Sequence, residues 1–573
     1  MPLSFSNAQD FNWTVRKIAV VGPGIVGMPM AALLAQARIR EGQAEPARIV
    51  VVQRDSPTSG WKVAAINAGK SVIGGVEPGL DEVVSQAVAE GILSATHDYD
   101  DIADADMVLI SVQTDKEGFG PDYGPLFDSL DHLTAALLKR PAGNIPVVVF
   151  ESTLAPSSMA TVIRERFARA GLVEGRDVLL GNSPNRVMPG RLVERVAASD
   201  KLVAGLHPLT PVLIRRIYGR IVTRGRLHQT NSMTAEVVKT LENAYRDVRI
   251  AFAAELVRYC DDHDIDFYAL RDEVNRSLEQ SDSASGSATA VPSGAILVPS
   301  IGVGGHCLPK DGILLWWRRH ESGADTSASL ILRAREINDA SPAASVALAE
   351  AHFGCLSGKR VALLGVAYRF DSEDTRNSPT LSLAALLRDK GCQVRLQDPY
   401  VKSDDQNLRR TGFGDVFSND VAATLADAQA VFFCVGHGVY QRDVEKLLAS
   451  VPIGSPVFDG ANLFEARTIE SLGHVYAGIG RGSRKPAPEL VVYARAAFDA
   501  MERSVANELL ELIAFLNEHY AQDAFNRVSL DTVRELAGSC VTGCVIAEPG
   551  EVDALAGDGP ALRMSRADAP VAV

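Results

Sequence analysis

The stretch Lys17-Ile-Ala-Val-Val-Gly22-Pro-Gly24-Ile-Val-Gly27 decides the fold of this chain. Its apolar, β-branched start predicts a buried strand, and the apolar segment from Met28 to Ala37 predicts the helix that follows. The Gly-x-Gly-x-x-Gly turn between them lets the backbone approach a pyrophosphate at a helix N-terminus, where free amides attract the anion. The alternative is a tight strand-to-helix turn that binds nothing. The predicted dinucleotide contacts are Gly22, Gly24, Ile25, Val26 and Gly27.

Strand and helix patterns alternate through most of the chain. Apolar runs that predict further strands lie at residues 48–53, 107–112, 147–150, 360–365, 394–396, 430–435 and 457–458. This alternation predicts an α/β fold with two Rossmann-like, doubly wound parallel-sheet domains, joined by a long central helix and followed by a helical C-terminal extension. We expect the domains at residues 1–225, 226–345, 346–482 and 483–573.

The end of the second predicted strand bears on the choice of dinucleotide. This strand ends in Gln53-Arg54-Asp55. An acidic residue at this place binds the ribose diol of NAD, whereas a basic residue accommodates the 2′-phosphate of NADP. Asp55 therefore favours NAD and Arg54 favours NADP. We expect NAD, with NADP as the alternative.

The segment from Thr234 to Asp264 predicts the long central helix. Its apolar residues recur every three or four positions and form one stripe. Lys239 and Asn243 lie off that stripe, one turn apart on the same polar face. They are candidates for a functional pair, although the pattern alone also fits an ordinary solvated helix face.

A second candidate lies in the stretch Val303-Gly-Gly-His-Cys307-Leu-Pro-Lys-Asp311-Gly312. Because the glycines before Cys307 carry no side chain, its thiol is sterically open, and Asp311 is placed to lie one helical turn away. The apolar run from Ile313 to Trp317 predicts the start of a helix. This arrangement suits a catalytic cysteine with a helping carboxylate. The alternative is a buried structural thiol in a glycine-rich turn.

Composition excludes several classes of protein. The 573 residues carry a formal net charge of −14, which argues against nonspecific binding to nucleic acid or an anionic membrane. Seven scattered cysteines suit reduced thiols in a cytoplasm better than a disulfide framework. Cys540 and Cys544 lack a second pair of ligands, so no metal site is predicted. Neither a signal peptide nor an apolar run of transmembrane length is evident. We therefore expect a cytoplasmic protein.

The last ninety or so residues differ in pattern from the rest. The segment from Glu489 to His519 predicts an amphipathic helix. Beyond Gly538 the chain is rich in Gly, Ala, Asp and Pro, a composition typical of a flexible tail. A helix used for packing or oligomerisation is the favoured interpretation, and the sequence assigns this extension no function.

Several stretches, in order, resemble the UDP-glucose/GDP-mannose dehydrogenase family over roughly residues 17–482. Besides the glycine turn they are Glu151-Ser152-Thr153, Ser183-Pro184, Ala235-Glu236-x-x-Lys239-x-x-Glu242-Asn243, Gly304-Gly305-His306-Cys307-x-Pro309-Lys310-Asp311, Asp374-Thr375-Arg376-x-Ser378-Pro379 and Tyr476-x-Gly478-Ile-Gly480-Arg481-Gly482. Their joint presence is far more specific than any single motif. The Gly-Gly-His-Cys form and Asn243-Ala-Tyr-Arg-Asp-Val resemble the branch that acts on UDP-N-acetylhexosamines.

The resemblance implies a four-electron, NAD-dependent oxidation of a nucleotide sugar's C6 hydroxyl to a carboxylate. Cys307 would add to the intermediate aldehyde and later carry a thioester that water hydrolyses. Lys239 and Asn243 would stabilise oxyanions, and Asp311 would orient or deprotonate the water by way of Thr153. The family's further cofactor contacts map to Thr114, Thr153 and Lys310. Its substrate contacts map to Asn185, Arg186, Lys239, Asn243, Arg249, Gly304, Gly305, Tyr368, Arg369 and Arg376.

The resemblance also implies that the second α/β domain holds the UDP group and that the protein is a homodimer or higher homo-oligomer. The chain departs from the family in three places. Asn185 replaces the usual Glu after Ser-Pro, and Arg369 replaces the usual Lys after Tyr368. The family places an arginine in the loop before the cysteine, yet residues 277–306 contain no Lys or Arg.

These departures leave alternatives to an N-acetylhexosamine dehydrogenase. The chain could be a catalytically altered or inactive relative that binds nucleotide sugars, or a dehydrogenase for an unusual nucleotide sugar. A two-electron alcohol dehydrogenase of the 3-hydroxyacid type is disfavoured, since simple hydride transfer requires neither Cys307 nor a second α/β domain.

Overall fold

The computed structural model describes residues 11–74, 77–141, 145–186, 190–279, 295–539, 544–552, 562 and 564. The chain divides into two compact units. Unit 1 comprises Met1–Glu242, Leu314–Ala324 and Leu509–Ile546, and unit 2 comprises Asn243–Ile313, Asp325–Glu508 and Ala547–Val573. Three helices contribute residues to both units: α8 (Ser232–Asp262), α10 (Leu308–Glu321) and α19 (Pro488–Tyr520). The domain limits expected from the sequence stay predictions.

Unit 1 is built on an eight-stranded sheet that starts from the strand of the glycine-rich stretch. In spatial order its strands are β10 (Leu227–Asn231), β9 (Lys201–Gly205), β8 (Leu179–Asn182), β7 (Val147–Phe150), β4 (Met107–Ile110), β1 (Lys17–Val21), β2 (Arg48–Val52) and β3 (Leu93–Thr96). Neighbouring strands are parallel except at the β8–β9 pair, which is antiparallel. The sequence therefore predicted β1, β2, β4 and β7 of the parallel core, but neither β3 and β8 nor the reversed pair β9 and β10 at the edge.

Both faces of this sheet are covered by helices, as its continuous apolar strands require. Ile18 and Val20 face a core that includes residues of α1 (Gly27–Gln36), α3 (Leu80–Ala89) and α7 (Leu209–Tyr218). Ala19 and Val21 face the opposite core, which includes residues of α4 (Gly124–Leu137) and α5 (Arg164–Arg169). The remaining elements of this unit are α2 (Trp61–Asn67), η2 (Tyr99–Ile102), β5 (Asp115–Glu117), β6 (Gly120–Asp122), η3 (Met159–Ile163) and α6 (Leu192–Ala198).

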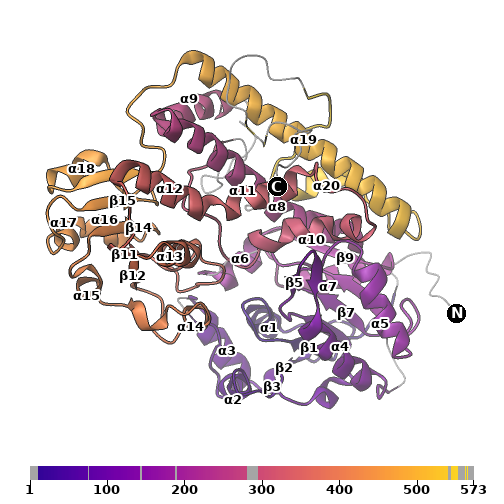
Figure 1. Ribbon diagram of the computed structural model, residues 1–573. Helices are drawn as coiled ribbons and strands as arrows, with labels where there is room; N and C mark the ends of the chain where they lie inside the picture. The colour runs from indigo at the N-terminus through magenta and orange to yellow at the C-terminus, as the bar shows by residue number, and fades with distance from the viewer. Residues whose placement is uncertain are drawn as a thin grey trace. The chain divides into compact units, whose positions relative to one another are not determined.

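Unit 2 contains a second, fully parallel sheet, drawn in brown and orange in Figure 1. In spatial order its strands are β13 (Phe417–Ser418), β12 (Gln393–Gln397), β11 (Arg360–Leu364), β14 (Ala430–Phe433), β15 (Pro456–Asp459) and β16 (Val475–Gly478). Numbered along this domain, the strands lie in the order 3-2-1-4-5-6, with β11 as the first strand. This is the doubly wound order of Rossmann-like sheets. The sequence prediction of a second Rossmann-like sheet is confirmed.

Shorter helices surround this sheet and the unit 2 portion of α8. They are α9 (Phe267–Glu279), α11 (Leu330–Asp339), α12 (Ser341–Phe353), α13 (Pro379–Asp389), α14 (Gln406–Arg410), η4 (Gly414–Val416), α15 (Val421–Leu425), α16 (Gly438–Arg442), α17 (Val444–Leu448) and α18 (Ala466–Ser471). The C-terminal extension forms α19, a continuous gold helix in Figure 1, and then α20 (Leu530–Ala537) in unit 1. The helix expected between Glu489 and His519 is thus confirmed with one residue added at each end.

One predicted boundary was wrong. Helix α10 begins at Leu308, directly after the cysteine, and not at the apolar run that starts at Ile313. Pro309 suits the first turn of a helix because its fixed φ is helical and its missing N–H has no partner there in any case. The carbonyl of Cys307 accepts the N–H groups of Lys310 and Asp311, which closes that first turn. Among the helices within the described ranges, none is both long and apolar enough to cross a bilayer.

Candidate active site

The glycine turn after β1 has the shape that a pyrophosphate requires. Gly22 has a φ of +90°, and a Cβ there would lie 2.9 Å from the Ser111 carbonyl oxygen. A Cβ on Gly27 would lie 2.1 Å from the Gly22 oxygen, so both glycines permit close packing of the turn. At Gly24 the Cβ direction is open, with none of the described atoms within 4 Å. The turn therefore leaves space at the start of α1 for a phosphate group to reach the backbone.

The residues after β2 are exposed at the same edge of the sheet. Arg54 Nη1 lies 3.1 Å from Asp128 Oδ2, so its guanidinium is paired within the protein. Asp55 is also exposed, and its Oδ1 is 2.5 Å from the position of a Cβ on Gly60. Of the two residues predicted to lie near the ribose of the cofactor, Arg54 and Asp55, the arginine is thus already paired with a carboxylate. This favours the interpretation in which Asp55 meets a ribose diol.

Two predicted threonines meet at the point where the strand order reverses. Thr114 follows β4 and is 4% exposed, and its hydroxyl donates to the Thr153 carbonyl at 2.7 Å. Because β4 and β7 are neighbours, the segments that follow them lie together at the carboxyl edge of the sheet. This edge, next to β1, is where doubly wound sheets bind their ligands. The structure thus brings the glycine turn, Thr114 and Thr153 to one region.

Helix α8 is tied to the segment that carries Thr153. The buried Glu236 accepts the N–H groups of Ser157 and Met159, each at 2.8 Å. Burial raises the pKa of Glu236 to about 8, although these two hydrogen bonds oppose the rise. Lys239, one turn further along α8, is only 9% exposed, and its Nζ has no hydrogen-bond or ion-pair partner within the described part of the chain. A buried cation of this kind is available to a ligand.

The residues around the cysteine form a second cluster, within unit 2. Asp311 is fully buried and accepts hydrogen bonds from Lys310 Nζ at 2.8 Å and from Asn243 Nδ2 at 2.6 Å. Cys307 is exposed at the start of α10. The structure therefore joins three of the predicted residues directly, and it places the thiol at the surface one helical turn before the buried carboxylate.

The loop after β11 holds the glycine pair that precedes the cysteine. The N–H of Gly305 donates to the Arg376 carbonyl at 2.8 Å, and Asn377 Nδ2 donates to the Gly305 carbonyl at 2.9 Å. Gly305 has a φ of +87°, and a Cβ on Gly304 would lie 2.6 Å from Tyr368 Cβ. Glycine is required at both positions, because a side chain would be strained at the first and would collide at the second.

The predicted substrate residues of this loop lie near the thiol. Arg376 is paired with Asp374, whose hydrogen bond raises the pKa of Arg376, and the charge of Cys307 contributes in the same direction. Burial raises the pKa of Tyr368, with smaller contributions from Asp374 and Cys307. Cys307 is thus within electrostatic range of both side chains. Arg369 is exposed, with its guanidinium 5.2 Å from the centre of the Phe370 ring.

The other predicted substrate residues are held by the protein itself. The N–H of the half-buried Asn185 donates to the Glu151 carbonyl at 3.3 Å. Arg186 has a side chain that is 1% exposed and forms an ion pair with Glu242. Arg249 is buried and donates to the Ala295 carbonyl. Direct contact of these residues with a substrate stays a prediction.

Three models of the UDP-glucose/GDP-mannose dehydrogenase family match this chain consecutively: the NAD binding domain at residues 16–222, the central domain at 233–340 and the UDP binding domain at 362–466. UDP-N-acetyl-D-mannosamine dehydrogenase of Pyrococcus horikoshii is 30% identical over 471 residues, which cover 81% of this chain and 99% of that protein. The chain belongs to the UDP-glucose/GDP-mannose dehydrogenase family.

Other relatives agree with this assignment. NDP-N-acetyl-D-galactosaminuronic acid dehydrogenase of Ralstonia nicotianae is 30% identical over 465 residues, covering 79% of this chain and 97% of the relative. The crystal structure of NDP-N-acetyl-D-galactosaminuronic acid dehydrogenase from Methanosarcina mazei Go1 has a TM-score of 0.69 and 30% identity, and the match covers 84% of this chain and 98% of that one. This family member is therefore an NAD-dependent nucleotide-sugar dehydrogenase, an oxidoreductase that acts on a CH–OH group.

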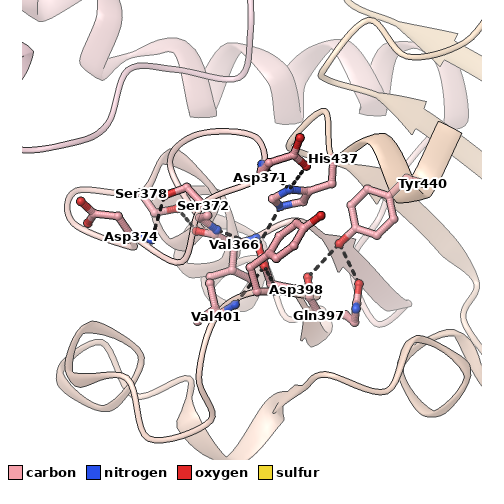
Figure 2. Close-up of polar contacts among 12 residues, drawn as sticks. Val366, Asp371, Ser372, Asp374, Ser378, Gln397, Asp398, Val401, His437 and Tyr440 are labelled. Carbon is pink, nitrogen blue, oxygen red and sulfur yellow. Dashed lines mark hydrogen bonds and ion pairs between the residues drawn. The ribbon is translucent and has the colours of Figure 1, made fainter. Parts of the chain in front are cut away.

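The second α/β domain of the dehydrogenase contains a buried network that supports the loop after β11 (Figure 2). Asp398 follows β12 and accepts N–H groups from both its own loop, at Tyr400 and Val401, and the loop after β11, at Val366 and Ala367. His437 Nε2 lies 3.0 Å from Asp398 Oδ2. Burial acts to raise the pKa of Asp398, but His437 and the backbone donors outweigh it and hold that pKa below its ordinary value.

The same network continues into the loop of Tyr368 and Arg376. His437 Nδ1 accepts the N–H of Asp371 at 2.9 Å, so the ring proton lies on Nε2 and is donated to Asp398. The apolar run at residues 394–396 predicted the strand that precedes Asp398, but neither Asp398 nor His437 was singled out from the sequence. The available signal for Asp398 was an acidic residue followed by a proline directly after a strand. No signal in the sequence pointed to His437, because its partner Asp398 lies 39 positions away.

Proposed function

We propose that this dehydrogenase oxidises the C6 hydroxyl of a UDP-N-acetylhexosamine to a carboxylate through a covalent intermediate on Cys307. The observation that carries the proposal is the cluster beside the exposed thiol, in which Lys310 and Asn243 both hold Asp311. A carboxylate held from two sides is oriented to accept a proton. The named activities of the relatives support the class of sugar.

The proposed reaction proceeds in two oxidations. When bound, NAD accepts a hydride from the substrate carbon. Loss of the hydroxyl proton and one hydride gives the aldehyde, and the Cys307 thiolate adds to its carbon to form a thiohemiacetal. Loss of a second hydride from that carbon gives a thioester. Water then attacks the thioester, the thiolate leaves, and the net change is one alcohol, two NAD and one water to one carboxylate, two NADH and three protons.

The chain's own residues have distinct roles in these steps. The Asn243 amide has a second proton besides the one donated to Asp311, and Lys239 carries a positive charge; by resemblance to the family, both stabilise the oxyanions. Asp311 accepts a proton from the attacking water, by way of Thr153. The start of α10 adds a favourable dipole for the anionic sulfur of Cys307.

The two α/β domains would bind the two nucleotides. In the first, Gly22, Gly24, Ile25, Val26 and Gly27 would contact the pyrophosphate of NAD, Asp55 its ribose, and Thr114, Thr153 and Lys310 the rest of the cofactor. In the second, Arg376 would meet the diphosphate of UDP, because a guanidinium matches phosphate geometry. The substrate would also contact Asn185, Arg249, Gly304, Gly305, Tyr368 and Arg369.

The test is the stoichiometry of NADH across a panel of UDP-sugars with NAD and NADP. We expect two NADH per sugar, a uronic acid by mass, and preference for N-acetylhexosamines. Replacement of Cys307 by serine should abolish formation of the acid. Wild-type rates and the same acid from Cys307→Ser would show that the thioester mechanism is wrong.

A second candidate is a dehydrogenase for a different nucleotide sugar. Two observations favour it: Asn185 stands where a carboxylate is usual, and no basic residue occurs between residues 277 and 306. Turnover of another nucleotide sugar, with N-acetylhexosamines inert, would support it. Binding across the whole panel without NADH would instead indicate a catalytically altered relative.

We further propose a cytoplasmic homodimer or higher homo-oligomer. The part of α8 in unit 2 is already packed against α19, with the Phe252 and Phe498 rings 5.5 Å apart and the Tyr245 hydroxyl donating to Glu502. The face of α8 that α19 covers is therefore not available for a contact between subunits. The molar mass in solution, measured by light scattering, tests this.

A further inference from the structure

The C-terminal extension lies beyond the region that the family models match. The last of those models ends at residue 466, whereas α19 and α20 occupy Pro488–Tyr520 and Leu530–Ala537. Within unit 1, Leu509, Leu512, Ile513 and Leu516 bury one face of α19. Polar contacts made by residues 525–539 of the extension are more informative, because two sets of them hold Asn231 and Arg186, the residues that in turn hold the segment 232–242 of α8.

The first set holds the start of α8. Asn231 Oδ1 accepts the Thr234 N–H at 2.8 Å, which is the geometry of a helix N-cap. The amide nitrogen of the same side chain donates to two carbonyls of the extension, those of Phe525 at 2.9 Å and Arg527 at 2.8 Å. These carbonyls orient the amide so that its oxygen, not its nitrogen, faces the helix. The extension thus sets the cap of α8.

The second set holds the segment three turns later. Arg186 pairs with Glu242 of α8, with Nε 3.3 Å from Oε2. Its other nitrogens donate to the extension: to the Leu536 carbonyl at 2.9 Å and to the Ser539 hydroxyl at 3.1 Å. Leu536 is in the last turn of α20, where the helix dipole favours a cation. Arg186 therefore connects the extension to α8 through a buried ion pair.

Lys239, the residue with a role in the proposed chemistry, lies between these two points of α8. Glu236, in the middle of the segment, is bonded to the backbone after Thr153, and Lys239 lies between Glu236 and Glu242. Fixing a helix at its cap and again three turns later fixes both its axial position and its rotation. Lys239 is then aimed by contacts that the extension completes.

We propose that the C-terminal extension is a built-in part of the active-site scaffold, with Asn231 and Arg186 as positioning residues that fix Lys239. The inference rests on the proposed function for the role of Lys239. It assigns Arg186 an indirect role, because its side chain is 1% exposed and forms an ion pair with Glu242 of α8. Ordinary packing of an added helix would not require buried polar contacts at the cap.

A matched pair of variants in the full-length chain tests the first contact. Asn231→Ser retains an N-cap hydroxyl for α8 but loses both bonds to the extension. Asn526→Ser also removes a buried amide, one that binds the Leu206 carbonyl after β9. We expect similar falls in Tm for the two variants, a fall in kcat of about tenfold for Asn231→Ser alone, and little change in the KM for the nucleotide sugar. Equal kcat for the two variants would overturn the proposal.

Arg186 provides the second test through a comparison of kcat with KM. Arg186→Met should lower kcat by about tenfold or more with a KM within about twofold, and Arg186→Lys, which retains the ion pair, should recover part of the loss. A rise in KM with unchanged kcat would instead identify Arg186 as a direct substrate contact and overturn its positioning role.

Hydrogen exchange separates this inference from the proposed function, because it requires no turnover. In Asn231→Ser and Arg186→Met the amides of residues 232–242 should exchange about tenfold faster than in the wild type, and in Asn526→Ser they should not. If the wild type proves inactive on every sugar but the exchange pattern holds, the proposed function fails while the scaffold role stands. Unchanged exchange at residues 232–242 in all three variants would refute the scaffold role.

Discussion

The two α/β domains share a strand order but use the same place in it differently. In the first domain the turn after β1 is open at Gly24, and the acidic residue after β2, Asp55, is exposed. In the second domain the acidic residue after β12, Asp398, is fully buried and holds the loop after β11. The first domain thus leaves the end of its second strand open, whereas the second domain uses the carboxylate at the end of its second strand to hold its own backbone.

The largest effect should come from removing the carboxylate of Asp398, which holds two loops of the second domain together. Asp398→Ala would leave four N–H groups, three of them buried, and His437 without this acceptor. We expect the free energy of unfolding to fall by about 3–5 kcal/mol, measured by urea denaturation. The same substitution at Asp55 is the control and should leave stability within about 0.5 kcal/mol. Equal losses at both positions would remove the distinction between the domains.

The pH dependence of stability should have opposite signs at two buried acids. The pKa of Glu236 is raised to about 8. Its contribution to the free energy of unfolding is therefore complete below pH 4.5 and is lost as the pH rises to about 8. The loss is on the order of 3 kcal/mol between pH 5 and 8. The pKa of Asp398 is lowered, so its contribution is present above about pH 4 and disappears as the pH falls through the folded-state value.

Denaturation curves at several pH values, with Glu236→Gln beside the wild type, measure the first of these effects. The variant should have a flatter dependence between pH 5 and 8. If its slope equals that of the wild type, another group is responsible.

Filling the open turn of the first domain should abolish cofactor binding without unfolding the protein. Gly24→Val adds a side chain where no described atom lies within 4 Å. We expect NAD affinity to fall by about 100-fold, or about 2.7 kcal/mol, with Tm nearly unchanged. Binding of UDP, followed by calorimetry in the same variant, is the internal control. A parallel loss of UDP affinity would mean that the substitution disturbs more than the turn.

The smallest effect concerns the ribose contact. Asp55→Ala should weaken NAD binding by about tenfold, because one bidentate contact to a diol contributes about 1.4 kcal/mol. The affinity for NADP should change less, since its 2′-phosphate does not use the carboxylate. The ratio of the two KM values reports the change, and an unaltered ratio would assign cofactor choice to another residue.

Local patterns in the sequence were sufficient for much of the fold and for part of the site. The alternation of apolar runs predicted both sheets, and the long helices at Thr234 and Glu489 were found within a few residues of their observed ends. Asn243 and Asp311 were each predicted as site residues from motifs typical of the family, but the hydrogen bond between them was not predicted. The start of α10 was misplaced, because the prediction used the apolar run and neglected Pro309 in the first turn of the helix.

The sequence by itself determined properties that depend on neighbours along the chain: strand and helix periodicity, the glycine turn at Gly22, and the open thiol after a glycine pair. Only the tertiary structure decided which distant groups meet. It joined Asp398 to His437, reversed β9 and β10, and brought Asn231 and Arg186 against an extension some 300 residues later. The physical reason is that periodicity and backbone angles are set locally, whereas a buried polar group takes whichever partner the folded chain brings within hydrogen-bond distance.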